Sequence, residues 1–96
     1  MEYVVKEVAY KDNDKRNGII AIKAENILSF WNTVETQSKE EAINNIETGS
    51  KYYTDYEKNT PVNIVNAEDG KYLRTDANDT SEDNLGELPT FIYNKN

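Results

Sequence analysis

The order of apolar and polar positions in the first 24 residues predicts a β-hairpin. Two sets of side chains alternate loosely along one strand, with Tyr3, Val5 and Ala9 on one side and Val4, Val8 and Tyr10 on the other. A strand with apolar residues on both faces is usually paired and covered. Residues 11–18 are polar and end in Asn-Gly, a dipeptide that favours hairpin turns, and a β-branched run at 19–24 leads back. We therefore expect an N-terminal hairpin over residues 1–24.

Residues 25–37 fit two patterns. Ile27, Phe30, Trp31 and Val34 are spaced like a helical stripe, whereas residues 31–36 are rich in strand formers. We interpret the segment as a strand extension or an irregular connection. In either form we expect Phe30 and Trp31 to pack on the core.

The strongest helix signal begins at Ser38. Ser38 and Glu41 have the spacing of a capping box, in which each side chain accepts a hydrogen bond from the other residue's backbone amide. Apolar residues follow at helical spacing, and Gly49 offers a left-handed stop. We expect a helix over residues 38–49 that lies on one face of a sheet.

Residues 51–75 predict further strands, including a second hairpin. An alternating run that contains three tyrosines opens the segment. The hairpin strands flank a two-residue turn at Asp69-Gly70. The expected register sets Val65 opposite Arg74, with Tyr72 on the same face.

Together these elements predict an α+β fold with a small curved antiparallel sheet of about five strands and one helix packed on one face. A chain of 96 residues is long enough for one domain with a single modest core. Within that domain, residues 1–24 form the hairpin, 38–49 the helix, 51–75 the later strands and 76–96 an acidic loop and tail.

The amino-acid composition excludes several kinds of catalytic and metal-binding site. The chain has no cysteine and no histidine, which excludes disulfides, thiolate nucleophiles, Cys/His zinc sites and histidine-based catalysis. We therefore expect no enzyme activity and no cofactor. The net charge of −7 argues against direct binding to nucleic acid and to anionic membrane surfaces.

The chain has no apolar run long enough to cross a membrane and no export signal at its start, so we expect a cytoplasmic protein. It is rich in Asn, Lys, Ile and Tyr and has two arginines. These frequent residue types have AT-rich codons, which is consistent with a bacterial or phage genome.

Three motifs, in order and with their spacing, resemble a known family. They are Ser38-Lys-Glu-Glu-Ala-Ile43 with Gly49, then Gly70-x-Tyr72-Leu-Arg-Thr75, then Asp83-Asn-Leu-x-x-Leu-Pro89. The chain is similar over residues 16–91 to domain-of-unknown-function family 3892, a group of small bacterial and phage proteins, but has a longer segment at 25–37. The resemblance implies a small α+β fold and a non-enzymatic role, and it supplies no activity.

Arg74 is the leading candidate for a binding residue. An arginine on a strand face beside a tyrosine can offer its planar guanidinium to a carboxylate or phosphate and stack on a ring. Alternatively, Arg74 forms an internal ion pair with Asp76, Asp79 or Asp83. Asn84 either faces a ligand next to Arg74 or hydrogen-bonds the loop backbone. The predicted ligand-binding residues are Arg74, Asn84, Tyr72 and Thr75.

The acidic loop has a partial likeness to a calcium-binding EF-hand. Asp76, Asn78, Thr80 and Glu87 occupy positions one, three, five and twelve of such a loop. Ser81 replaces the glycine at position six, and a strand precedes the loop in place of a helix. We therefore expect a solvated acidic loop and no metal site.

These observations favour a small non-catalytic binding protein. The leading hypothesis is an adaptor or inhibitor, encoded by a phage or mobile element, that recognises a compact anionic or nucleotide-like ligand or a host protein. The alternative is an acidic mimic of nucleic acid that blocks a host DNA- or RNA-binding protein. Because one helix cannot cover the whole sheet, we also expect a homo-oligomer.

Overall fold

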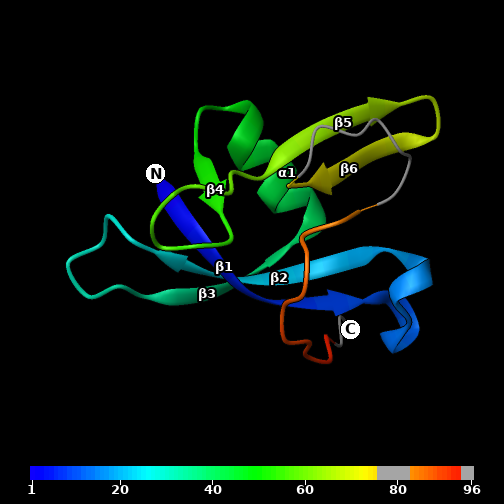
Figure 1. The fold of residues 1–96 in the computed structure, drawn as a ribbon, viewed down its shortest axis with the longest axis horizontal. Helices are drawn as coiled ribbons and strands as arrows, with labels where there is room; N and C mark the ends of the chain where they lie inside the picture. The colour runs from blue at the N-terminus through cyan, green and yellow to red at the C-terminus, as the bar shows by residue number, and fades with distance from the viewer. Residues whose placement is uncertain (76–82, 94–96) are drawn as a thin grey trace.

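Four strands form the larger sheet of the protein (Figure 1). They are β1 (Glu2–Tyr10), β2 (Ile19–Asn26), β3 (Val34–Ser38) and β4 (Lys51–Tyr53), in the spatial order β3-β2-β1-β4. The computed structural model describes residues 1–75 and 83–93. The β1–β2 and β2–β3 pairs are antiparallel, whereas β4 runs parallel to β1. The sheet is therefore mixed, because the helix between β3 and β4 carries the chain across the sheet before β4 joins it.

The predicted N-terminal hairpin is confirmed in β1 and β2. Two short 3-10 turns, η1 (Lys11–Asn13) and η2 (Lys15–Asn17), connect the strands. An irregularity between Val5 and Glu7 shifts the register, so that Val5 lies opposite Ala24 and Val8 opposite Ile22. Val5 and Val8 therefore share the core face. The predicted grouping of Val8 with the opposite face was wrong, because a bulge inverts the alternation of side chains.

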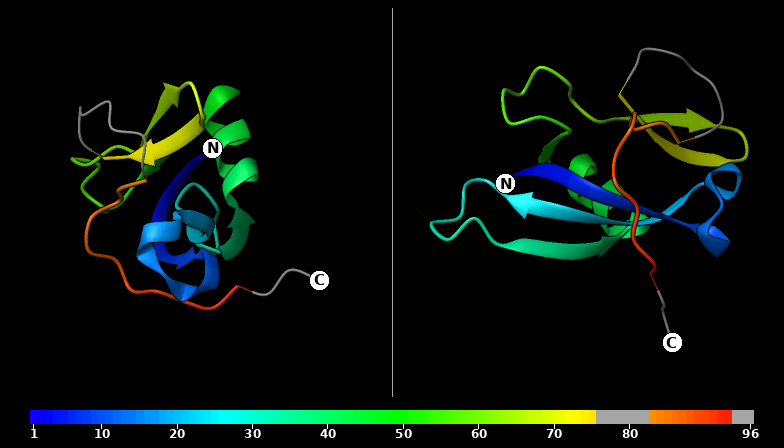
Figure 2. Two further views of the ribbon diagram at one scale, coloured as in Figure 1. Left: turned by 90° about the vertical axis from the view of Figure 1, so that its right-hand side faces the viewer. Right: turned by 60° about the horizontal axis from the view of Figure 1, so that its bottom comes forward.

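The predicted helix is confirmed as α1 (Lys39–Glu47). Ser38 caps it: its Oγ accepts from the Glu41 N–H at 3.1 Å, and the Ser38 N–H donates to Glu41 Oε1 at 3.2 Å. Gly49 follows with a φ of +110°, as expected for a helix stop. The helix packs on one face of the larger sheet and buries Ala42 there (Figure 2).

A second, two-stranded sheet consists of β5 (Asn63–Ala67) and β6 (Gly70–Arg74). Val65 lies opposite Tyr72 and Ala67 opposite Gly70, so the predicted pairing of Val65 with Arg74 was off by two residues. A shift of two leaves every side chain on its predicted face, because strand side chains alternate with a period of two. Leu73 points into the core from this sheet.

The C-terminal segment crosses the side of the larger sheet that lies away from α1 and pairs with the edge of β1 beyond β4 (Figures 1 and 2). The Val8 N–H donates to the Pro89 carbonyl and the Phe91 N–H donates to the Val8 carbonyl, both at 3.0 Å. The α+β class with one helix on the sheet is thus confirmed. One connected core unites both sheets and the helix, and its buried members are Tyr3, Val5, Val8, Ile19, Ile22, Ala24, Ala42, Tyr52, Val62, Leu73 and Leu85.

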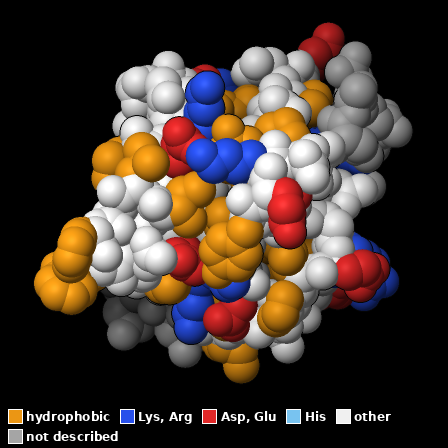
Figure 3. Space-filling model, turned by 60° about the vertical axis from the view of Figure 1, so that its left-hand side comes forward, with side chains coloured by type: hydrophobic (Ala, Val, Ile, Leu, Met, Phe, Trp, Pro, Cys, Tyr) orange, Lys and Arg blue, Asp and Glu red, His pale blue; other side chains and the backbone are white. Residues whose placement is uncertain are grey.

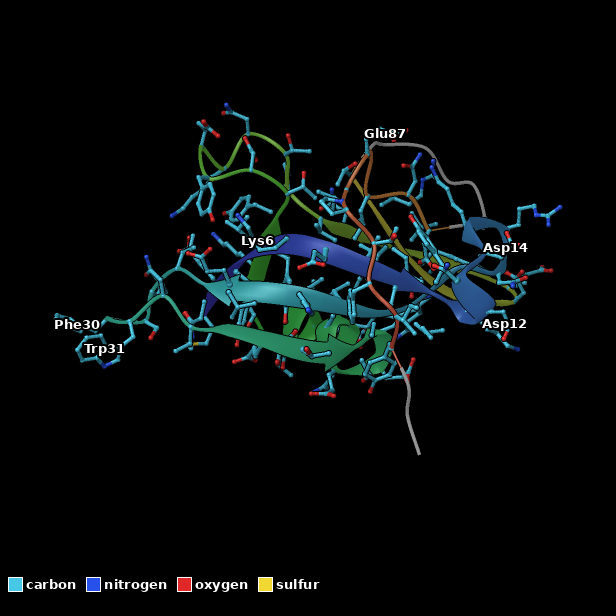
Figure 4. All side chains as sticks on the ribbon, turned by 90° about the horizontal axis from the view of Figure 1, so that it is seen from below. Lys6, Asp12, Asp14, Phe30, Trp31 and Glu87 are labelled. Atoms are coloured by element: carbon cyan, nitrogen blue, oxygen red, sulfur yellow. The ribbon has the colours of Figure 1, made fainter. Side chains whose placement is uncertain are left out.

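The ambiguous segment, residues 25–37, forms the end of β2, the tip of the β2–β3 hairpin and most of β3, so the interpretation as a strand extension or an irregular connection is confirmed. The chain leaves β2 at Asn26 and enters β3 at Val34, and the tip between them projects from the body of the protein (Figure 4). Phe30 is 87% exposed and Trp31 79% exposed. The expected packing of these two rings on the core was wrong, because the hairpin extends past the part of the sheet that the helix covers.

In the described part of the chain, α1 is too short and too polar to span a membrane, and no other helix qualifies.

Candidate functional site

Asp83 joins three elements at one end of the molecule. Its Oδ1 accepts a hydrogen bond from the Leu73 N–H of β6 at 2.8 Å. Its Oδ2 accepts from the Ile19 N–H of β2 at 2.9 Å and from Lys39 Nζ of α1 at 3.0 Å. The side chain is 1% exposed. One carboxylate therefore fastens the small sheet, the large sheet and the first turn of the helix to one another.

Gly18 allows the backbone to approach this carboxylate. A Cβ at position 18 would lie 3.2 Å from Asp83 Oδ2, and the φ of Gly18 is +84°. Both features favour glycine. Sequence reasoning assigned Asp83 only as one possible partner of Arg74 and missed this central role. The available signal was its place at the start of the Asp83-Asn-Leu motif.

Asn84 continues the connection along the end of β6. Its N–H donates to the Leu73 carbonyl at 2.8 Å, and its carbonyl accepts from the Thr75 N–H at 3.0 Å. Its side-chain Oδ1 accepts from the Gly86 N–H at 3.0 Å. The amide oxygen therefore binds loop backbone, which was one of the two roles expected for Asn84.

Arg74 lies inside the fold, next to Asn84. It is 3% exposed and has interaction partners, and its backbone pairs with Asn84 in a short parallel bridge. Thr75 is half-buried, and its Oγ1 donates to the Asn84 carbonyl at 3.4 Å. The structure thus brings the four predicted residues into one neighbourhood, but it places the Arg74 side chain in the interior. Two of the predicted ion-pair partners, Asp76 and Asp79, lie outside the described residues.

The ring of Tyr72 forms one wall beside this neighbourhood. Its hydroxyl donates to Asp69 Oδ2 at 2.9 Å, and Lys39 Nζ lies over the ring, 4.8 Å from its centroid. The hydrogen bond to Asp69 and, secondarily, desolvation raise the pKa of Tyr72. The phenol is therefore neutral at physiological pH and presents an aromatic face with a fixed hydroxyl.

A cleft of about 450 Å³ lies between this wall and the η2 turn. Its lining residues are Lys15, Arg16, Asn17, Gly18, Tyr72, Asp83 and Asn84. We call it the Tyr72 cleft. Of the four predicted site residues, Tyr72 and Asn84 line it and Arg74 and Thr75 do not. The chain's other arginine, Arg16, lines the cleft and is exposed, as expected of Arg74 from the sequence.

One edge of the Arg16 guanidinium is held by Asp14, and its other edge is exposed. Its Nε and Nη2 donate to the Asp14 carboxylate at 3.1 and 2.8 Å, while 89% of the side chain is exposed. This pairing lowers the pKa of Asp14 and raises that of Arg16. Because only one edge of the guanidinium is occupied by Asp14, the remaining N–H groups can donate to a ligand.

Lys15 separates the Tyr72 cleft from a second one. This neighbouring cleft measures about 340 Å³ and is lined by Tyr10, Asn13, Lys15, Gly86, Glu87, Leu88 and Thr90. Lys15 belongs to the lining of both clefts. Its charge is therefore available to a ligand in either one.

The described residues contain no group of three or more acidic side chains arranged to hold a metal ion. Most of the EF-hand-like positions, namely Asp76, Asn78 and Thr80, lie outside the described residues. Of the charges around the Tyr72 cleft, Lys39 neutralises the carboxylate of Asp83, and Asp14 pairs with Arg16. Lys15 is the remaining cation of the lining, and Asp69, which accepts from the Tyr72 hydroxyl, is the remaining anion beside it.

Comparison with family models matches residues 5–89 to the family described as "Protein of unknown function (DUF3892)". The match covers both sheets, the helix and the segment with Asp83 and Asn84. Searches of curated proteins and of solved structures find no match.

Proposed function

The chain belongs to the DUF3892 family of proteins of unknown function, and we propose that it is a non-catalytic binding protein that holds a compact anionic ligand in the Tyr72 cleft. One observation carries the proposal. Two predicted site residues, Tyr72 and Asn84, share a cleft with the cations of the η2 turn. An aromatic ring beside positive charge is the combination that a nucleotide-like molecule needs for its base and its phosphate.

The size and charge of the cleft support this class of ligand. A volume of about 450 Å³ falls within the range of small-molecule sites. Lys15 supplies a mobile point charge, whereas Arg16 supplies a planar group already oriented by Asp14. In this proposal the anionic group of the ligand contacts Lys15 and Arg16, and its apolar or aromatic part lies against Tyr72.

The role of Arg74 changes in this proposal. Its side chain is buried and has interaction partners within the protein, so in this proposal it stabilises the structure next to the cleft and does not contact the ligand. Asn84 acts in both ways, because its backbone holds the end of β6 while its side chain lines the cleft.

We further propose that binding is stoichiometric, as in an adaptor or inhibitor carried by a phage or mobile element. The absence of histidine and cysteine from the sequence supports a role without catalysis. The alternative of an acidic nucleic-acid mimic has less support on the face in Figure 3, where acidic and basic side chains are interspersed. A mimic needs a continuous row of carboxylates in place of phosphates.

The test is calorimetric titration with nucleoside mono- and diphosphates and, separately, with inorganic phosphate. We expect one site per chain. Arg16→Ala and Lys15→Ala should each weaken binding about tenfold, because each removes a charge-assisted contact. Tyr72→Ala should weaken nucleotides more than phosphate, because only nucleotides have a ring to stack.

Lys51→Ala is the matched control, since it removes one exposed positive charge from β4, outside the cleft lining. It should leave the affinity unchanged. If Lys51→Ala and Lys15→Ala lower the affinity equally, the loss comes from the overall charge of the protein, and the proposed site is wrong. If none of these anions binds, the proposed class of ligand is wrong.

A further inference from the structure

The tip of the β2–β3 hairpin is an ordered structure that presents aromatic rings to solvent. Asn26 is 6% exposed, and its Oδ1 accepts from the backbone N–H groups of Leu28 and Ser29 at 3.1 and 3.2 Å. The Asn26 N–H also donates to the Thr33 carbonyl at 2.8 Å, which closes the tip. A buried asparagine thus fixes the backbone that displays the rings.

Phe30 and Trp31 contact each other at this tip. Their ring centroids are 4.7 Å apart and their planes meet at 84°, an edge-to-face arrangement that aromatic pairs favour. Figure 4 shows both side chains projecting from the far end of the hairpin. Two large rings held this far from the core stabilise the fold little, and exposed rings of this kind are typical of a surface that binds another molecule.

Further exposed apolar side chains gather around the tip. The Ile27 N–H donates to the Glu2 carbonyl at 3.0 Å, so Met1 and Leu28, their neighbours in the chain, both adjoin this hydrogen bond. Val34 lies opposite Glu25, whose carboxylate accepts from the Tyr56 hydroxyl at 2.6 Å. We call this surface the apolar end. Its members are Met1, Leu28, Phe30, Trp31, Val34 and Tyr56.

The apolar end holds almost all the large apolar side chains that the described chain exposes. Each member shows more than half of its surface, and among the described residues only Ile92 does so elsewhere. Figure 3 looks towards this end and shows apolar side chains spread across it. Six such residues, three of them aromatic, expose on the order of the roughly 800 Å² that each partner contributes to a standard interface.

The charges around the apolar end suit a second copy of the same chain. Residues 1–6, 25–35 and 51–60, which build this end, hold five of the 18 acidic and three of the 11 basic residues. They thus carry −2 of the net charge of −7, in proportion to their length, whereas the tip residues 27–33 carry no charge. The tips of two copies can therefore meet without bringing like charges together, whereas an anionic membrane repels a chain of net charge −7.

We propose that the apolar end is a self-association surface, on which a second copy of this chain packs through the same residues in a two-fold dimer. Such a contact is self-complementary, and rings on a rigid tip lose little conformational entropy on burial. Phe30 and Trp31 form its centre, and the other four members surround them. The contact is independent of the Tyr72 cleft, which has no residue in common with it.

Sedimentation and the emission of Trp31 test this proposal together, because Trp31 is the only tryptophan of the chain. From low micromolar to millimolar concentration we expect the mass to double from 11.0 kDa. The emission should move to shorter wavelength over the same range, as the indole leaves water. Phe30→Ser should raise the dissociation constant at least about tenfold.

Ile92→Ser is the matched control, because it makes an equivalent change at an exposed residue outside the apolar end. It should leave the dimer unchanged. Circular dichroism should show that both variants remain folded. A chain that keeps a mass of 11.0 kDa and a constant emission throughout would overturn the proposal. So would a dimer that Phe30→Ser leaves intact, or a monomer whose Trp31 emission shifts only on vesicles of zwitterionic lipid.

Discussion

At the scale of single residues, Asp83 is a charged group in an environment that is costly to satisfy. A carboxylate that is almost fully buried loses its hydration, which is costly unless hydrogen bonds and a counter-charge replace it. Two backbone amides and the Lys39 ammonium supply that replacement. Since Lys39 also lies over the ring of Tyr72, the residue that neutralises Asp83 also holds one wall of the cleft.

Asp83→Asn tests this role. Asparagine has nearly the same shape, but it is neutral and brings an amide group that must face either a backbone N–H or the lysine. We expect the free energy of unfolding to fall by about 2–4 kcal/mol. Urea unfolding, followed by circular dichroism, measures the change.

Asp69→Asn is the control for charge. Asp69 is exposed and accepts one hydrogen bond, from Tyr72. Its replacement should cost less than about 1 kcal/mol. Similar losses at the two positions would mean that Asp83 does not fasten the elements together.

At the scale of elements, α1 depends on Ser38, the residue that caps its start. The capping box at Ser38 and Glu41 satisfies two backbone amides that a helix start otherwise leaves without partners. Because α1 covers one face of the larger sheet, the stability of the cap contributes to the stability of the whole core.

Ser38→Ala should lower the free energy of unfolding by about 1 kcal/mol, since the Glu41 N–H loses its acceptor. Glu41→Gln keeps an oxygen at the position that accepts from the Ser38 N–H and should change stability by less than about 0.5 kcal/mol. Thermal unfolding of the two variants compares them directly. A larger loss for Glu41→Gln would show that charge, and not the cap, matters here.

The elements that local signals specify were predictable from the sequence. The cap at Ser38, the stop at Gly49 and the first hairpin each depend on residues close together in the chain. The parallel pairing of β4 was not predictable, because it depends on how α1 crosses the sheet. The exposure of Phe30 and Trp31 was also missed, since their residue types favour burial and only the reach of the hairpin decides otherwise.

The candidate site was predictable only in part, for a similar reason. Tyr72 and Asn84 were identified from a strand and a loop that are neighbours in sequence. The cations that share their cleft come from the turn at 15–17, which is distant in sequence and is held near β6 by the hydrogen bond from the Ile19 N–H to Asp83. A sequence pattern also cannot tell a buried arginine from an exposed one, so Arg74 was chosen over Arg16.

At the scale of the whole molecule, the two proposed surfaces lie at opposite ends. Asp14, which orients Arg16, and the rings of Phe30 and Trp31 are at the two extremes of Figure 4. A dimer through the apolar end would therefore leave both Tyr72 clefts open. Ligand binding and self-association can be measured independently.

Stability should fall in alkali because buried tyrosines resist ionisation. Tyr52 is 1% exposed and bonded to Gln37 and Asn45, and burial raises its pKa to about 12. Burial also raises the pKa of Tyr3 and Tyr10. An unfolded tyrosine loses its proton near pH 10, so the folded chain holds more protons above that pH.

The stabilisation from Tyr52 is thus complete below about pH 10 and is lost as pH rises towards 12, by at most about 1.4 kcal/mol per pH unit. Urea midpoints at a series of pH values from neutral to strongly alkaline measure this loss. Tyr52→Phe should be less stable at neutral pH and show a shallower decline in alkali. An equally steep decline would assign the effect to other groups.

The position of β1 in the middle of the sheet has a consequence for the speed of folding. Its parallel neighbour, β4, comes some forty residues later, and Val8 exchanges hydrogen bonds with Pro89 and Phe91 near the other end of the chain. Such distant contacts require long loops to close before they contribute any energy. We therefore expect folding in the range of about milliseconds to seconds that is typical of non-local topologies. If the first hairpin forms early, the edge of β1 at Val8 keeps backbone groups exposed to water until residues 89–91 pair with it.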